Sequence, residues 1–379
     1  MGVWGLRSQR VQGRASAFLP SHLPRIGPRM TWAAVLRHLV FAGGLAVVSA
    51  VVVGAMVSAG VLDRPAARKA HEVPTPKGGG VGIVVAFLLG ISILYGFAEF
   101  ARLADLYFRG VVLAAVAIAV VAYLDDLRDF PFLVKLGAQV GAALLAVGTG
   151  LYVRVFNLPG LGPVDIGIWG AVVTMGWILF ATNAMNFIDG LNGLVGGTVL
   201  VACGFLAVIA AGQEGWFVYC AAMLLAAAVA GFLPFNFPVA RIFMGDVGSQ
   251  FCGFVLAMLG VAAARFQAVE MSFLLVPMLL AGVLFDVAFT LGRRLLAGEN
   301  VVHAHRSHLY QVAHRAGVDA RAIAVVHWGF AAVGGGVALA FTYAPSGMKL
   351  PLLVGLMVPQ VVWLGFVVMR ARGAGLGRW

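Results

Sequence analysis

The sequence predicts an all-α integral-membrane protein, a polytopic bundle of about eleven transmembrane helices whose functional site faces one side of the membrane. Hydrophobic residues make up 61% of the 379-residue chain, and charged residues make up only 11%. Apolar stretches near twenty residues long recur from end to end, and about 20 apolar residues cross a bilayer core as a helix. Acidic, amide and histidine side chains cluster where these stretches end. The mean hydropathy is +0.97, and the apolar stretches occupy so much of the chain that no large soluble domain is expected.

Each predicted helix is an apolar run bounded by charged residues, glycine or proline. The segment 151–164 contains Pro159 and Pro163 and is too broken to span a membrane, so it is predicted to be a loop. The three cysteines lie inside apolar runs without disulfide or metal-ligand spacing, which indicates small core residues. The predicted spans have approximate cores at 38–60, 79–98, 109–124, 131–150, 165–183, 193–212, 216–235, 248–265, 271–292, 321–343 and 350–370.

Lysine and arginine are distributed unequally between the two sets of loops, and the richer set is expected to be cytoplasmic. The poorer set holds Arg102, Arg109, Arg154, Arg265 and Lys349. The richer set includes Arg64, Arg68, Lys69, Lys77, Arg128, Lys135, Arg241, Arg293, Arg294, Arg306, Arg315, Arg321, Arg370, Arg372 and Arg378. All acid and imidazole clusters fall on the richer side, which indicates one shared site.

Three parts are predicted along the chain. Residues 1–35 form a basic segment that is either a solvated arm or the product of an upstream start, with Met30 as the initiator. Residues 36–372 form a single membrane domain, and residues 373–379 form a short cytoplasmic tail. The net charge of +11 is interpreted as loop charge facing anionic lipid, so no nucleic-acid partner is expected.

The first two polar clusters combine basic and acidic side chains. Lys77 precedes three glycines, and a basic side chain beside exposed N–H groups can hold phosphate oxygens. The alternative for Lys77 is a positively charged membrane anchor. Asp125 and Asp126 end a predicted span, and adjacent carboxylates favour a compensating cation such as Mg²⁺. The alternative for this pair is a solvated loop with Arg128 as the partner.

The third and fourth clusters carry amides and two further aspartates. The spacing of Asn183, Asn186 and Asp189 places them near one helix face, with Asn192 following in a glycine-rich turn. Amides both donate and accept, so this set suits an amide- or hydroxyl-rich ligand. Asp246 precedes another span, where it could be a helix N-cap, and a cap can also be a metal ligand.

The fifth cluster is His305-Arg306-Ser307-His308, which offers cationic donors for a pyrophosphate. Zinc is a rival ligand, but no H-E-x-x-H motif or cysteine pair supports it. Asp286 lies inside an apolar run, and the sequence leaves open whether it faces the site or pairs within the bundle.

Taken together and in this order, the clusters resemble the polyprenyl-phosphate N-acetylhexosamine-1-phosphate transferases, the glycosyltransferase family 4 that includes phospho-MurNAc-pentapeptide transferase. Asp125–Asp126 matches the family's aspartate pair. Asn183-x-x-Asn186-x-x-Asp189-Gly190 matches its Asn-x-x-Asn-x-x-Asp-Gly motif, and Phe243-Met244-Gly245-Asp246-x-Gly248-Ser249 matches its Phe-Met-Gly-Asp-x-Gly-Ser motif. The resemblance covers roughly residues 60 to 315.

This resemblance implies transfer of a sugar 1-phosphate from a UDP-N-acetylhexosamine to undecaprenyl or another polyprenyl phosphate in the bacterial cytoplasmic (inner) membrane. It implies Mg²⁺, with Mn²⁺ as a substitute, and a homodimer is compatible with it. The implied catalytic residues are Asp125, Asp126, Asp189 and Asp246, and the implied metal ligands are Asp246, Asp125 and Asp126. The implied substrate-binding residues are Lys77, Asn183, Asn186, Asn192, His305, Arg306 and His308.

Departures from the family pattern indicate the branch. The peptidoglycan enzyme has three consecutive histidines where this chain has His305-Arg306-Ser307-His308, and a lysine where this chain has Asp129. The form seen here is similar to enzymes that start O-antigen or other polysaccharide synthesis. Asn192 replaces an aspartate that the family often carries, which leaves one acid fewer near the nucleotide.

Three rival functions are less consistent with the residues. A cation-coupled transporter uses acids near the membrane midplane and inverted repeats, and neither is visible. An intramembrane aromatic prenyltransferase needs two Asp-rich motifs, and this chain has one tight pair. A structural scaffold leaves the polar clusters unexplained.

Overall fold

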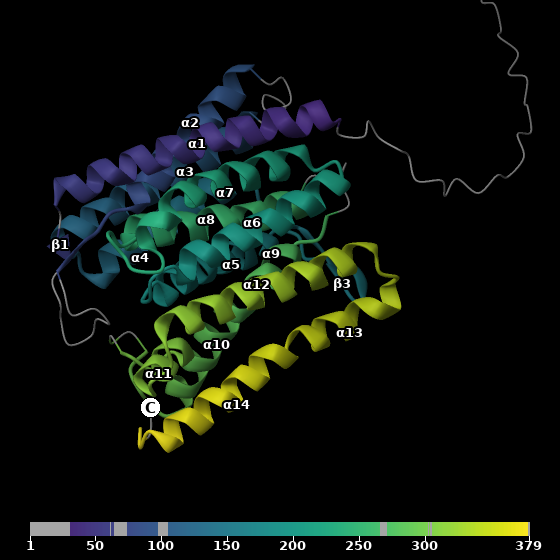
Figure 1. Ribbon diagram of the computed structural model, residues 1–379. Helices are drawn as coiled ribbons and strands as arrows, with labels where there is room; N and C mark the ends of the chain where they lie inside the picture. Colours follow the sequence, from purple (N-terminus) through teal and green to yellow (C-terminus); the bar gives the residue numbers. More distant parts are fainter. Residues whose placement is uncertain are drawn as a thin grey trace, which may run out of the picture.

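The computed structural model describes residues 31–60, 62–63, 74–97, 105–265, 271–301, 303 and 305–377. Long helices lie roughly side by side in a single bundle (Figure 1). In chain order the helices are α1 (Trp32–Ala59), α2 (Gly80–Phe97), α3 (Asp105–Arg128), α4 (Phe132–Gly148), α5 (Trp169–Ile188), α6 (Leu194–Gly212), α7 (Trp216–Asn236), α8 (Gly245–Arg265), α9 (Leu275–Leu279), α10 (Ala281–Leu296), α11 (Leu309–Arg315), α12 (Ala320–Tyr343), α13 (Ser346–Leu356) and α14 (Val358–Gly373).

The predicted all-α polytopic membrane fold is confirmed. Within the described ranges, nine helical segments are long and apolar enough to cross a membrane, with α13 and α14 counted together. Two of the about eleven predicted spans differ in length or continuity from the prediction. The segment 131–150 forms the 17-residue α4, which begins directly after Pro131. The segment 271–292 is divided at Leu280 into the five-residue α9 and the 16-residue α10.

Two small antiparallel ribbons complete the described structure. β1 (Leu62–Asp63) pairs with β2 (Thr75–Pro76). β3 (Val155–Leu158) pairs with β4 (Gly162–Asp165), so the predicted loop 151–164 is a hairpin. The predicted basic segment falls largely in residues 1–30 and, like Arg64, Arg68 and Lys69, lies outside the described residues.

Helix α8 forms the centre of the bundle and is buried along almost its whole length. Small residues allow its neighbours to approach closely, as is common between membrane helices. A Cβ on Gly80 would lie 2.3 Å from the Cα of Gly248, and a Cβ on Gly253 would lie 2.9 Å from the Cα of Thr182. α8 is therefore held directly against α2 and α5, which fixes the position of its first turn.

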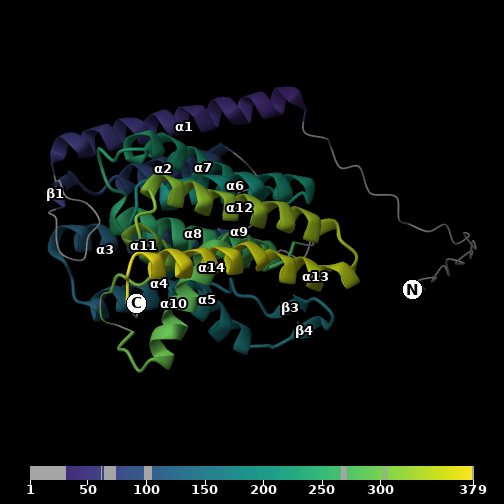
Figure 2. The ribbon, with the colours of Figure 1, turned by 60° about the horizontal axis from the view of Figure 1, so that its bottom comes forward.

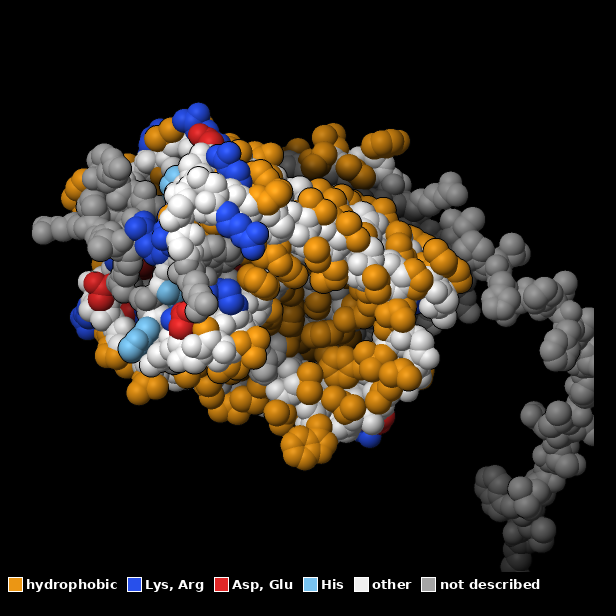
Figure 3. All heavy atoms as spheres, turned by 90° about the horizontal axis from the view of Figure 1, so that it is seen from below, with side chains coloured by type: hydrophobic (Ala, Val, Ile, Leu, Met, Phe, Trp, Pro, Cys, Tyr) orange, Lys and Arg blue, Asp and Glu red, His pale blue; other side chains and the backbone are white. Residues whose placement is uncertain are grey.

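The outer helices α1 and α13–α14 expose many large apolar side chains, which in a bilayer contact lipid. Apolar side chains cover most of one face, while charged side chains gather at one end (Figure 3). Figure 2 shows that β1, α11 and the C-terminus lie at one end of the bundle, and β3, β4 and α13 lie at the other. The connections that carry the polar clusters meet at the end that holds α11.

Candidate active site

A pocket opens at the α11 end of the bundle, and residues from distant parts of the chain line it. The structure brings together most of the residues predicted from the sequence. Its lining includes Lys77, Asp125, Asp126, Asn186, Asp189, Asn192, Asp246 and Arg306. Asn183, His305 and His308 are described by the structure but lie outside this lining. Lining residues for which the sequence predicted no role in the site include Asp129, Lys135, Asn236, Tyr310, Gln311, His314 and Arg315.

Asp126 at the end of α3 caps the start of α8. Its Oδ1 accepts a hydrogen bond from the Asp246 N–H and its Oδ2 accepts one from the Val247 N–H, both at 3.2 Å. An anionic group at a helix N-terminus satisfies free N–H donors and interacts favourably with the helix dipole. Gly245 has φ of 75° and lies against this carboxylate, where a Cβ would approach Asp126 Oδ2 to 2.6 Å. The carboxylate is therefore fixed by backbone groups on both oxygens.

Asp125 binds Lys135, which the sequence predicts only as loop charge. Lys135 Nζ lies 2.9 Å from Asp125 Oδ2 and 3.7 Å from Asp246 Oδ2. The Phe130 N–H donates to Asp125 Oδ1 at 2.7 Å. Pro131 at the start of α4 and Asp129 with φ of 51° turn the chain sharply, so Lys135 returns over the aspartates. A cation between two carboxylates compensates charge that neither could hold alone in a protein interior.

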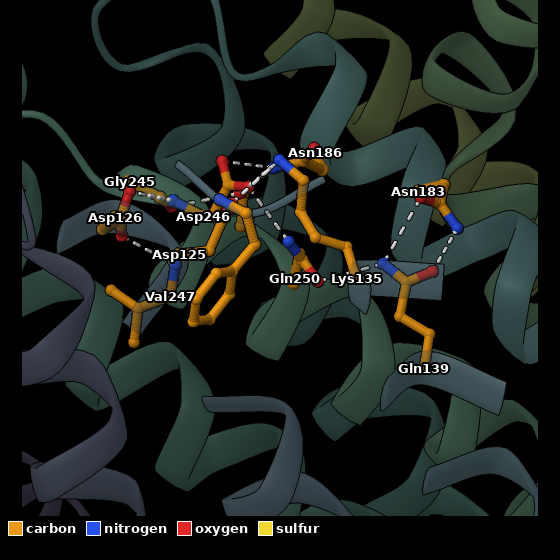
Figure 4. Close-up of polar contacts among 12 residues, drawn as sticks. Asp125, Asp126, Lys135, Gln139, Asn183, Asn186, Gly245, Asp246, Val247 and Gln250 are labelled. Atoms are coloured by element: carbon orange, nitrogen blue, oxygen red, sulfur yellow. Dashed lines mark hydrogen bonds and ion pairs between the residues drawn. The ribbon is translucent and has the colours of Figure 1, made fainter. Parts of the chain in front are cut away.

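Asp246 in the first turn of α8 is held by side chains and not by the backbone N–H groups of its own helix (Figure 4). Asn186 Nδ2 donates to its Oδ1 at 3.0 Å, and Gln250 Nε2 donates to its Oδ2 at 3.1 Å. The N-cap alternative for Asp246 is therefore wrong, because Asp126 supplies the cap. The Asp246 carboxylate projects into the pocket and is available to a ligand.

Asn183 lies outside the pocket lining and is connected to Asp246 through two glutamine side chains. Its Nδ2 donates to Gln139 Oε1 at 2.6 Å, and Gln139 Nε2 donates to Gln250 Oε1 at 3.0 Å. Figure 4 shows these amides set apart from the aspartates, joined to them through Gln250. The sequence predicted that Asn183 contacts a ligand. In the structure its amide is instead hydrogen-bonded within the bundle, where it supports Gln139 and Gln250.

Asp189 follows α5 and lines the pocket. The pKa of its carboxyl group is raised well above its usual value, because the surrounding protein excludes water and because Asp246 and Asp126 add negative charge. The turn after it is shaped by Gly193, which has φ of 73° and whose N–H donates to Asn236 Oδ1 at 2.7 Å. Asp189 therefore lies beside two further carboxylates, those of Asp246 and Asp126.

The residues of the fifth cluster, His305-Arg306-Ser307-His308, occupy different environments. Arg306 lines the pocket, whereas His308 is buried and its Nδ1 lies 3.0 Å from Asp286 Oδ1. Burial and the positive charge around it lower the pKa of His305 to about 4, so this imidazole is neutral at pH 7. In this state His305 does not offer the cationic donor that the sequence predicts, and it lies outside the pocket lining. Asp286, which the sequence left open, pairs within the bundle.

The carboxylate oxygens in the pocket suit a hard cation that is bound partly by the protein and partly by substrate phosphates. Across the residues that the structure describes, no group of three or more Asp, Glu, His or Cys side chains is arranged to hold a metal ion by itself. Mg²⁺ is usually bound by one or two carboxylates together with water and substrate phosphates, so a complete protein ligand set is not required. A cation bound here would offset the repulsion between the carboxylates of Asp189, Asp126 and Asp246.

Comparisons with known proteins identify a family and several similar enzymes. The family model described as glycosyl transferase family 4 matches residues 108–264. A probable undecaprenyl-phosphate N-acetylglucosaminyl 1-phosphate transferase of Bacillus subtilis is 30% identical over 256 residues, covering 67% of this chain and 70% of that protein. A decaprenyl-phosphate N-acetylglucosaminephosphotransferase of Mycobacterium tuberculosis is 28% identical over 334 residues, covering 80% and 82%. An undecaprenyl-phosphate alpha-N-acetylglucosaminyl 1-phosphate transferase of Yersinia pestis is 29% identical over 279 residues, covering 70% and 72%.

Proposed function

Because the chain belongs to glycosyl transferase family 4, the polyprenyl-phosphate N-acetylhexosamine-1-phosphate transferases, we propose that it transfers an N-acetylhexosamine 1-phosphate from a UDP-sugar to a polyprenyl phosphate. The products are a polyprenyl-diphospho-sugar and UMP. This is a first membrane step in the synthesis of a cell-surface polysaccharide, O-antigen or cell wall. The observation that carries the proposal is the pocket in which Asp125, Asp126, Asp189 and Asp246 meet Lys77, Lys135 and Arg306.

In this reaction an oxygen of the lipid phosphate attacks the β-phosphorus of the UDP-sugar, and the bond from that phosphorus to the bridging oxygen of UMP breaks. A phosphate nucleophile is already largely ionised at neutral pH, so positioning and charge neutralisation matter more than a strong base. Asp125 would orient the lipid phosphate together with Lys135, to which it is bound. Lys77 and Arg306 would bind diphosphate oxygens, with Arg306 offering a planar fork of donors.

The carboxylates that line the pocket fit a divalent cation. Asp246 and Asp189 would hold Mg²⁺, or Mn²⁺ in its place, with Asp125 as a further oxygen donor. Asp126 is left out of this ligand set because both of its oxygens accept from N–H groups of α8. When bound, the metal neutralises charge on the diphosphate oxygens. Asn186 and Gln250 keep the Asp246 carboxylate turned toward the pocket. Asn192 would contact the nucleotide or the sugar.

The direct test uses purified protein, undecaprenyl phosphate and a panel of radiolabelled UDP-sugars, including UDP-GlcNAc and UDP-GalNAc. We expect one UDP-sugar to yield labelled lipid and an equal amount of UMP. Excess EDTA is expected to abolish product formation, and added Mg²⁺ is expected to restore it, since the diphosphate and the carboxylates need a shared cation. Full activity in EDTA would remove the metal from the proposal, and absence of labelled lipid with every UDP-sugar would remove the reaction itself.

The pocket is proposed to face the cytoplasm, where UDP-sugars are found. Basic residues concentrate at this end, including Arg128, Lys135, Arg241, Arg293, Arg294, Arg306, Arg315 and Arg321, and cytoplasmic loops carry such an excess. Ala297 is exposed at the end of α10, and Leu161 is exposed in the turn of the β3–β4 hairpin.

A labelling experiment checks this orientation. A cysteine at Leu161→Cys is expected to react with an impermeant thiol reagent in intact cells, whereas one at Ala297→Cys is expected to react only after lysis. The unmodified protein gives the background from its own cysteines, of which Cys203 and Cys252 are buried. The opposite labelling pattern would place the pocket on the outer side and contradict the proposal.

A further inference from the structure

Asp286 is a buried acid that the proposed chemistry does not use. It lies in α10 between apolar neighbours, and the residue is 1% exposed. A buried carboxylate without partners is strongly destabilising, so its partners show what it stabilises. Those partners lie mainly at the beginning of α11, more than twenty residues further along the chain.

Four donors surround the two oxygens of this carboxylate. Asp286 Oδ1 lies 3.0 Å from His308 Nδ1, and it accepts from the Leu309 N–H at 2.9 Å and the Thr290 hydroxyl at 3.2 Å. Its Oδ2 accepts from the Tyr310 N–H at 3.0 Å. Both oxygens accept from backbone N–H groups, so the carboxylate is the acceptor toward His308 Nδ1 as well. Three of the four donors therefore fix the start of α11 onto α10.

The start of α11 in turn forms one wall of the pocket. Tyr310 and Gln311 line it, as does Arg306 just upstream. The Gln311 side chain accepts from the His308 N–H at 3.3 Å, so the loop before α11 is bound to the same turn. A shift of this turn would move Arg306 and Gln311 together.

Tyr310 also connects this wall to the turn that holds Asp189. Its hydroxyl donates to the Phe187 carbonyl at 3.0 Å. It also packs so closely on Gly190 that a Cβ there would lie 2.2 Å from the hydroxyl oxygen. Phe187 and Gly190 flank Asp189, whose carboxylate lines the pocket. The contacts therefore run without interruption from Asp286 through Tyr310 to the turn that holds Asp189.

We propose that Asp286 is a positioning residue of the transferase, which acts through α11 to place Arg306 and Gln311 and, through Tyr310, the turn that holds Asp189. The placement of Arg306 matters for UDP-sugar binding only if the proposed function holds, whereas the mechanical link from α10 to the Asp189 turn stands on the contacts alone. Asp286 touches no substrate and carries no proton in the reaction.

The kinetic test compares Asp286→Ala, Asp286→Asn and the matched control Thr290→Val. Asp286→Ala leaves the donors of His308, Leu309 and Tyr310 without an acceptor, and kcat/KM for the accepted UDP-sugar is expected to fall about ten- to a hundredfold. The fall should include a higher KM for the UDP-sugar, with the KM for polyprenyl phosphate nearly unchanged. Asp286→Asn keeps one accepting oxygen and should be intermediate. Thr290→Val removes one donor but leaves α11 attached, so a change of no more than about threefold is expected.

A purely structural role predicts a different result. Loss of folded enzyme lowers the apparent kcat in proportion to the folded fraction and leaves both KM values unchanged. That pattern in Asp286→Ala would overturn the proposal. So would a Thr290→Val variant as impaired as Asp286→Ala.

Hydrogen–deuterium exchange of the full-length protein gives a readout that does not depend on turnover. In Asp286→Ala, exchange is expected to accelerate in the peptide containing Leu309 and Tyr310 and also in the peptide spanning 187–193. Unchanged exchange in the second peptide would refute the link through Tyr310. If the wild-type protein converts no UDP-sugar, the proposed function fails, while the exchange result still decides whether Asp286 holds the Asp189 turn.

Discussion

Replacing Asp246 with asparagine is expected to lower turnover by about a hundred- to a thousandfold while the protein remains folded in detergent. Asparagine has the same size and keeps one oxygen that can accept from Asn186 or Gln250, which are the two donors that hold Asp246. The cap of α8 is unaffected because Asp126 provides it. The negative charge that the cation and the diphosphate require is lost.

Initial rates of labelled-lipid formation at saturating substrates measure this effect, and thermal unfolding in detergent monitors the fold. Asp165→Asn is the matched control, since Asp165 is exposed on the β3–β4 hairpin at the other end and pairs with Arg154 at 3.1 Å. The control should retain normal turnover. If Asp246→Asn also retains it, the assignment of Asp246 to the metal and the diphosphate is wrong.

Lys135→Met is expected to lower turnover by about ten- to a hundredfold, comparable to the loss of a charge-assisted hydrogen bond. Methionine fills a similar volume but removes the cation that lies 2.9 Å from Asp125 and 3.7 Å from Asp246. The two carboxylates then repel each other, and Asp125 loses the partner that orients it. Lys135→Arg keeps the charge but has a larger, planar head group, so partial activity is expected.

The same lipid-forming assay measures both variants, with Arg154→Gln as a control for loss of a cation at the other end of the bundle. Equal, near-normal rates for Lys135→Met and Arg154→Gln would show that Lys135 is only loop charge. A selective loss in Lys135→Met, with unfolding temperature close to that of the wild type, is the expected outcome.

The sequence alone determined the membrane fold and the order of its spans, because the length of an apolar run is a local property that fixes whether a helix can cross a bilayer. It also predicted that Asp125–Asp126, Asn186, Asp189 and Asp246 belong to one site. Successive spans alternate in direction, so clusters at every second connection lie on the same side. The break at Leu280 and the short α4 were not predicted, since apolar composition does not distinguish a continuous helix from an interrupted one.

The tertiary structure alone decided which polar groups meet. Lys135 stands one turn into a helix whose sequence gives no sign of a site, and only the sharp turn at Asp129 and Pro131 brings it to Asp125. His308 was expected to bind substrate, but it is turned toward Asp286 on α10. Spacing along a helix fixes the face on which a side chain lies, whereas its partner depends on how the helices pack. The separation of ligand-facing residues from those that hold them in place is therefore a property of packing, which a single sequence does not contain.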